Sequence, residues 1–231
     1  MEASSLRDKI SSSEGRSEQP RWFQSGITYR SLCVRCNTEL LGAKYDPALG
    51  EFSAQVRALA NSPLALPAAI DVMIKPQPIM RSVLGHIAAQ GVERYQKGPY
   101  TEPIRDYLLD ADLPLPSLFR MYYWLYPFRS QVLVRDASRI ERLGSGQGGT
   151  AFWLMKFYPL AFMVTLNEPP QRLYRMENLD RFANIPFTQQ TSVRLSLRPL
   201  VPCRWPEYAG GPAAVLYGPQ AMVADPLQPR Q

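Results

Sequence analysis

The sequence predicts an α+β fold, with helices mainly in the first half and an antiparallel sheet mainly in the second. Two observations carry this prediction. The strongest helical periodicities lie in segments 46–60 and 77–92, and the apolar or alternating segments typical of strands lie mostly after them. The 22 prolines and 14 glycines of the 231-residue chain supply frequent stops between these elements.

Three segments have the pattern of helices. The first begins at Asp46, which we expect to be its N-cap, with Pro47 at the first helical position. The second begins at Pro78, and the third covers residues 101–111, with Thr101 as its cap. The apolar residues of the first two recur at helical spacing: Leu49, Phe52, Val56 and Leu59 in one, and Ile79, Met80, Val83, Leu84 and Ile87 in the other.

Residues 119–128 are the strongest strand candidate. Alternate side chains on both of its faces are apolar or aromatic, so we expect a central strand that is covered on both sides. One face carries Phe119, Met121, Tyr123 and Leu125, and the other carries Tyr122, Trp124 and Tyr126. Further strands are expected at 26–32, 69–75, 131–136, 151–157, 160–166 and 192–200, with a short helix at 177–184.

Composition divides the chain into four expected segments. Residues 1–22 are polar and Ser-rich and predict a disordered leader. Residues 23–62 contain a cysteine pair and the first helix, and residues 63–201 form the main α+β domain. Residues 202–231 are dense in Pro and Gly and predict a tail in which order fades.

The bulk composition narrows the class of protein. Three cysteines, an odd number, argue against a secreted disulfide scaffold. The first twenty residues have no apolar core that would make a signal peptide. The most apolar window, 151–166, is too short to span a bilayer and contains Lys156 and Pro159. We therefore expect a cytoplasmic protein without membrane contact.

The most distinctive motif is a pair of cysteines two residues apart, Cys33 and Cys36, followed by Asn37. This spacing places two thiolates around one tight turn, as a zinc ion requires from one element of a tetrahedral site. Over about residues 27–55, "LCVRCN" with the following "LLGAKYDP" and helix resembles the second half of the zinc-bound treble clef in HNH-type endonucleases. The resemblance implies that Cys33 and Cys36 bind zinc and that Asn37 occupies a family-like position.

The chain also departs from the family pattern. No CxxC precedes Cys33, and no histidine precedes it to serve as the general base. The zinc site is therefore incomplete, and we do not expect catalysis from this chain. The expected function is that of a non-catalytic or inactivated HNH-related protein that binds DNA, RNA or a protein partner. Two alternatives are an HNH-related endonuclease whose front half is missing from this chain, and a structural or interaction protein with no nucleic-acid role.

The cysteine pair itself has several interpretations. It is either a purely structural turn, or a zinc site shared with a second chain in a homodimer, or a zinc site completed by Cys203 and His86, or a redox pair. A redox pair normally sits at a helix N-terminus, and residues 37–45 separate this pair from the predicted helix. That separation argues against the redox interpretation.

Other residues provide candidate contacts. A net charge of +6 permits binding to nucleic acid, and we expect four arginines of the predicted sheet region to contact phosphates: Arg129, Arg135, Arg139 and Arg142. His86, the sole histidine, lies at the edge of an apolar helical stripe and is expected to be partly buried and hydrogen-bonded rather than catalytic.

Overall fold

The computed structural model describes residues 2–5, 21–22, 31–62, 65–90, 100–140, 149–166, 176–197, 203–208, 213–217 and 222–225. The predicted fold class is confirmed. Helices lie between residues 36 and 109, and antiparallel strands dominate the part of the chain that follows.

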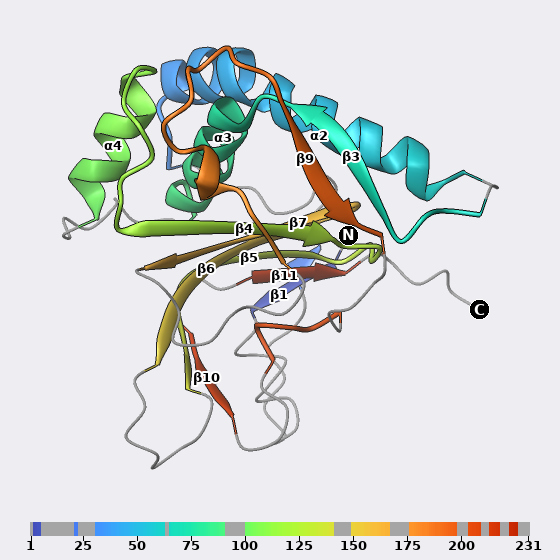
Figure 1. Cartoon of the computed structure of the whole chain (residues 1–231). Coiled ribbons are helices and arrows are strands. Elements are labelled where there is room, and N and C mark those ends of the chain that lie inside the picture. The colour runs from blue at the N-terminus through green and yellow to red at the C-terminus, as the bar shows by residue number, and fades with distance from the viewer. Residues whose placement is uncertain are drawn as a thin grey trace.

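A large antiparallel sheet forms the centre of the molecule (Figure 1). Among the described residues it has nine strands, in the order β2-β1-β11-β5-β6-β7-β4-β8, with β10 paired to β5 beside this path. The strands are β1 (Glu2–Ser5), β2 (Arg21–Trp22), β4 (Phe119–Leu125), β5 (Gln131–Ile140), β6 (Thr150–Phe157), β7 (Leu160–Leu166), β8 (Glu177–Asn178), β10 (Ala214–Leu216) and β11 (Met222–Asp225).

A helical layer covers one face of this sheet (Figure 1). It contains η2 (Cys36–Tyr45), α2 (Asp46–Ala60), α3 (Pro76–Ala88) and α4 (Thr101–Leu109), and the short 3₁₀ helix η3 (Asp180–Phe182) lies nearby in the chain's second half. A separate two-stranded ribbon, β3 (Ala69–Ile74) with β9 (Thr191–Ser196), lies on the same side of the large sheet.

The first helix differs most from the prediction. Helical backbone begins at Val34, runs through the π-helix η2 and continues directly into α2. The π pattern is seen at its end, where the Asp46 N–H donates to the Leu41 carbonyl five residues back. The prediction that Asp46 caps the helix is therefore wrong, because a turn of helix already precedes it and its side chain binds elsewhere.

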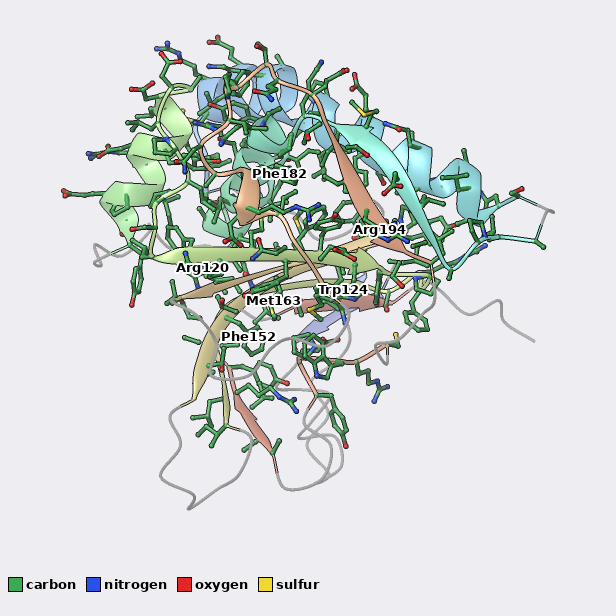
Figure 2. All side chains as sticks on the ribbon, viewed as in Figure 1. Arg120, Trp124, Phe152, Met163, Phe182 and Arg194 are labelled. Carbon is green, nitrogen blue, oxygen red and sulfur yellow. The ribbon has the colours of Figure 1, made fainter. Side chains whose placement is uncertain are left out.

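The sheet separates two apolar cores. On the helix side, Phe119, Met121 and Tyr123 of β4 pack with α2, α3 and α4. On the other side, Trp124, Phe152 and Met163 belong to a second core (Figure 2). The prediction that β4 is covered on both faces is confirmed. Strand β4 also has a paired strand on each edge, β7 along its whole length and the two-residue β8 over Tyr122 and Tyr123.

Helix α3 is the most deeply buried helix described, and every residue from Pro76 to Gly85 is buried. Its contact with η2 depends on Gly85. A Cβ at Gly85 would lie 2.4 Å from Leu41 Cδ2, so the absence of a side chain lets this leucine pack onto the helix in its present position. The close approach fixes the segment that carries the cysteine pair against the middle of the fold.

The expected segment boundaries remain predictions, but some of the described residues bear on them. Phe52 and Val56 of α2 share one core with β4 and α3, so the helix next to the cysteine pair packs into the main domain. Strands β1 and β2 fall within the expected leader, and β10 and β11 fall within the expected tail. The strand expected at 26–32 lies mostly outside the described residues.

Among the described residues, none of the helices has the length and apolar character needed to cross a bilayer.

Candidate functional site

The cysteine pair lies at the start of the helical segment that leads into α2. Cys33 immediately precedes the first helical residue, and Cys36 is the first residue of η2. The backbone N–H of Cys36 donates to the Cys33 sulfur over 3.3 Å, and the N–H of Asn37 donates to the Cys33 carbonyl over 3.0 Å. Both cysteines are free thiols, Cys33 exposed and Cys36 partly exposed.

This geometry makes the two thiols unequal. The hydrogen bond from the Cys36 N–H lowers the pKa of Cys33, and the hydrogen bond between the two side chains lowers it further. That same side-chain bond raises the pKa of Cys36, and partial burial adds to the effect. The pair therefore holds its first negative charge on Cys33, the more exposed sulfur.

The position of the pair corrects one argument from the sequence. Residues 37–45 were expected to separate the cysteines from the helix, but they are themselves helical. The pair thus sits at a helix N-terminus, where unpaired backbone N–H groups favour a thiolate. The argument against a redox pair was wrong for this reason.

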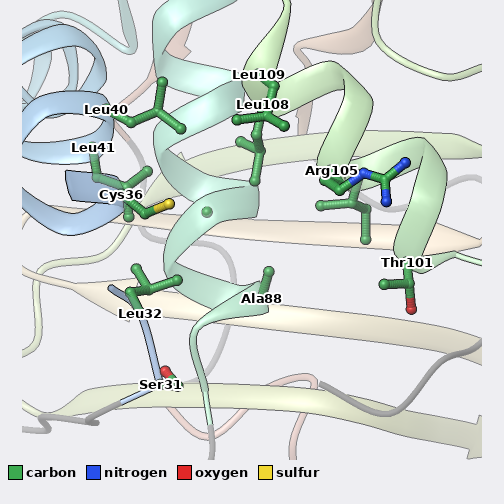
Figure 3. Close-up of a pocket in the computed structure, with 12 residues that line it drawn as sticks. Ser31, Leu32, Cys36, Leu40, Leu41, Ala88, Thr101, Arg105, Leu108 and Leu109 are labelled. Atoms are coloured by element: carbon green, nitrogen blue, oxygen red, sulfur yellow. The ribbon is translucent and has the colours of Figure 1, made fainter. Parts of the chain in front are cut away.

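An apolar pocket opens beside Cys36. It has a volume of about 260 Å³ and lies between η2, α3 and α4. Figure 3 shows the Cys36 sulfur pointing into this space from η2, with Leu40 and Leu41 above it and Ala88 across from it. Leu108 and Arg105 close the side formed by α4.

The polar groups at the pocket edge are few. The hydroxyl of Ser31 donates to the carbonyl of Ala89 and so anchors the chain just before the cysteines to the end of α3. The guanidinium of Arg105 pairs with Asp106 over 3.0 Å at the surface. Val34, between the two cysteines, is 79% exposed, and Leu109 at the pocket is 60% exposed. Charged groups lie next to these apolar side chains: Arg105 at the pocket, and Arg35 between the two cysteines, where it pairs with Glu39 over 3.3 Å.

The other expected zinc ligands lie elsewhere. Within the described part of the chain, no group of three or more His, Cys, Asp or Glu side chains is placed to hold a metal ion. Cys203 packs in the core on the far face of the sheet, next to Tyr126 and Ser130. The interpretation in which Cys203 and His86 complete a zinc site with the pair is therefore wrong.

His86 is half-buried and hydrogen-bonded, as its position on the helical stripe predicted. Its Nε2 lies 3.1 Å from Asp46 Oδ1, which also accepts a 2.7 Å bond from the Ser82 hydroxyl. Burial alone would raise the pKa of Asp46, but the hydrogen bonds and charge of His86, with the bond from Ser82, outweigh it, so this pKa is lowered. Asp46 and Ser82 were not identified from the sequence as partners of His86, because Asp46 was assigned to the N-cap of the first helix.

Of the four arginines expected to bind nucleic acid, the three that the structure describes do not share one surface. Arg129 is exposed in the turn before β5, and Arg135 donates to the carbonyl of Ala88 on the helix side. A bulge between Val134 and Ala137, with Asp136 at φ 61°, reverses the alternation of β5. Arg139 therefore points to the opposite face, and Arg142 lies outside the described residues.

Asn37, the remaining residue that the resemblance singled out, is exposed on η2. Its backbone carbonyl oxygen lies close to Gly42 across the widened π turn, and a Cβ added at Gly42 would be 3.1 Å from it. The pocket residues from α4, by contrast, were missed as site residues. In the sequence, these pocket residues are indicated by the helical spacing of Ile104 and Leu108. The segment that faces them across the pocket could not be recognised, because residues 31–45 were not predicted to be helical.

Comparison of the chain with protein-family models, with curated proteins and with solved structures gives no match.

Proposed function

We propose that the chain is a non-catalytic binding protein in which Cys33 and Cys36 supply two of the four ligands of a zinc ion, and a second copy of the chain supplies the other two. The observation that supports this proposal is the convergence of two free thiols at a helix N-terminus. Zinc in structural sites is tetrahedral and accepts thiolates at this spacing.

The local electrostatics favour a thiolate at the pair, which is the form of cysteine that binds zinc. A thiolate on Cys33 already receives the Cys36 N–H, and zinc displaces the proton that the two sulfurs share. Because the described residues offer no third ligand, one chain alone leaves half of the coordination sphere to be filled. The exposed Val34 between the cysteines gives a second chain an apolar contact next to the metal.

The relationship to HNH-type endonucleases remains part of this proposal and depends on Cys33, Cys36, Asn37 and the helix that follows them. Contact with DNA or RNA likewise remains a prediction, supported by the net charge of +6. A gel-shift titration at two salt concentrations tests it, since phosphate contacts weaken steeply as salt rises.

Dithiol exchange is a second candidate, favoured by the inequality of the two thiols. An exposed Cys33 with a lowered pKa and a less exposed Cys36 with a raised pKa match the attacking and resolving thiols of a disulfide exchange. In that reaction the Cys33 thiolate attacks a substrate disulfide and expels one thiolate. Cys36 then attacks the mixed disulfide, which releases the second substrate thiol and leaves Cys33 and Cys36 oxidised.

Metal analysis and mass measurement test the primary proposal. The protein is purified under reducing conditions, its zinc content is measured, and its mass in solution is followed by light scattering with and without a strong chelator. We expect one zinc for every two chains and a dimer that the chelator dissociates. Titration with Co²⁺ should produce the charge-transfer absorption of thiolate ligands.

Matched cysteine variants complete the test. Cys33→Ser and Cys36→Ser should each lose zinc and the dimer, whereas Cys203→Ser, at the cysteine on the far side of the sheet, should keep both. A zinc-free monomer with no cobalt–thiolate absorption refutes the zinc proposal. If that same protein reduces a small disulfide and Cys33→Ser abolishes the reaction, dithiol exchange replaces it.

A further inference from the structure

A second cavity lies in the helix layer, separate from the cysteine pocket. It has a volume of about 460 Å³ and lies between α2 and the adjoining ends of β5 and β6. Residues of α2 line it at successive turns from Asp46 to Arg57, and His86 reaches it from α3. The eleven helical steps from Asp46 to Arg57, at 1.5 Å each, make this stripe about 16 Å long.

The two ends of this cavity carry opposite charge. At one end, Asp46 Oδ1 accepts hydrogen bonds from both Ser82 and His86, so its Oδ2 stays available as an acceptor. At the other end is Arg57, which is exposed. Within the described part of the chain, its guanidinium lies 5.9 Å from the centroid of the Tyr158 ring, and no carboxylate pairs with it.

The region between the ends is mainly apolar, with Ser53 as a polar residue on the α2 side. Leu49 forms the α2 side, and Leu133, Met155 and Phe157 form the floor, all on the helix-facing side of the sheet. Gly50 lies on the same stripe, and a Cβ added there would meet no atom within 4 Å. A glycine in the middle of a helix costs stability, so its place at an open cavity leaves room for a ligand.

We propose that this cavity binds a linear amphipathic anion, with an acidic group on Arg57, an apolar chain over Met155 and a hydrogen-bond donor on Asp46. Charge complementarity fixes the orientation, because the anionic group meets the unpaired guanidinium and the donor meets the carboxylate. The length of the stripe suits an extended chain of about twelve carbons, since its two polar ends are about 16 Å apart. His86 positions the Asp46 carboxylate for this contact.

Calorimetric titration of the full chain with ω-hydroxydodecanoate, below its micelle concentration, tests the proposal. This probe has a hydroxyl donor at one end and a carboxylate at the other. We expect saturable binding at one site per chain. Dodecanoate, which lacks the hydroxyl, should bind about tenfold more weakly, because it loses one charge-assisted hydrogen bond.

Variants locate the binding site. Gly50→Leu places a side chain in the cavity at a position where its Cβ meets no atom within 4 Å, and it should abolish binding. Ala58→Leu, at an exposed position of the same helix outside the cavity, should bind as the wild type does. Arg57→Gln should weaken binding about tenfold, and Arg194→Gln, at an exposed arginine on β9, should not.

The outcome is independent of the zinc proposal, because Cys33→Ser with Cys36→Ser leaves the cavity intact and should leave the affinity unchanged. Absence of saturable binding overturns the inference. The inference is also overturned if the Gly50→Leu variant still binds the probe, or if Arg57→Gln and Arg194→Gln weaken binding equally. In either case the probe associates with the general protein surface and not with the cavity.

Discussion

Replacing Lys156 tests how the chain's last segments are held to the sheet. Lys156 lies on β6 with 0% of its side chain exposed, on the face away from the helices. Its ammonium donates to the carbonyls of Cys203 and Trp205, over 2.6 and 3.2 Å, and to Glu207 over 2.5 Å. The Tyr126 ring centroid is 4.9 Å away. All three N–H groups thus have acceptors, and they hold residues 203–207 in a turn against the second core.

The magnitude follows from the burial of both charges. Burial lowers the pKa of Lys156 and raises that of Glu207, so desolvation opposes both ionised forms. Glu207 is only 3% exposed, and among the described residues its Oε2 has no hydrogen-bond partner. Removing Lys156 alone leaves this carboxylate buried and unpaired, which costs about 3–5 kcal/mol. Replacing both partners by apolar side chains of similar volume costs far less, about 1–2 kcal/mol or less.

The experiment is a double-mutant cycle in urea, with Lys156→Met, Glu207→Met and the double variant. We expect each single variant to lose several times more stability than the double variant, with a coupling energy of at least about 2 kcal/mol. Lys44→Met, at an exposed lysine that contacts two ring faces, should change stability by less than about 1 kcal/mol. Additive single effects, or a loss of under 1 kcal/mol for Lys156→Met, would refute the reasoning.

Three further predictions follow from the helix layer. Arg81→Lys should cost about 3 kcal/mol in urea denaturation, because the buried guanidinium donates to carbonyls at the end of α4 that an ammonium cannot reach together. Gly85→Ala should cost about 1–3 kcal/mol and speed amide exchange in η2, since the new Cβ would lie 2.4 Å from Leu41 Cδ2. Because the pKa of Asp46 is lowered from its ordinary value of 3.8, its carboxylate stabilises the fold above pH 3.8, and this contribution is lost as the pH falls through the folded-state pKa. Asp46→Asn should therefore flatten the acid limb of a profile of stability against pH. An unchanged acid limb would contradict this prediction.

The periodicity of apolar residues in the sequence correctly predicted the helices and strands that are buried on one face or on both. The stripe of α3 and the alternation of β4 are dictated by the cores that they face. Both elements were predicted with nearly correct starts, but the predicted segments, 77–92 and 119–128, extend beyond the observed ends at Ala88 and Leu125. The pairing of strands across the sheet could not be predicted from the sequence. That β11 inserts between β1 and β5 depends on contacts more than eighty residues apart along the chain, which no local pattern encodes.

The candidate site shows a different limit. The spacing of Cys33 and Cys36 identified the pair, but the helix around it was missed because η2 is a π-helix. Its residues are not arranged on the 3.6-residue period that reveals an α-helix, so Leu40 and Leu41 did not register as one face. Asp46 was assigned to a cap for the same reason, and its contacts with Ser82 and His86 could not be foreseen.

Arg135 and Arg139 of β5 do not lie on one face of the sheet, and a single residue explains why. Strict alternation places Arg135 and Arg139 on one face, because they are four residues apart. Asp136 adopts φ 61°, which an acidic residue tolerates better than most, and its carboxylate accepts the Trp153 indole N–H over 3.0 Å. That contact gives the extra residue a partner on the helix side, so the bulge is anchored by a side chain, and every residue after it changes face. Arg135 and Arg139 therefore lie on opposite faces of β5, and contact of either one with nucleic acid remains a prediction that its mutation in a salt-dependent binding assay can test.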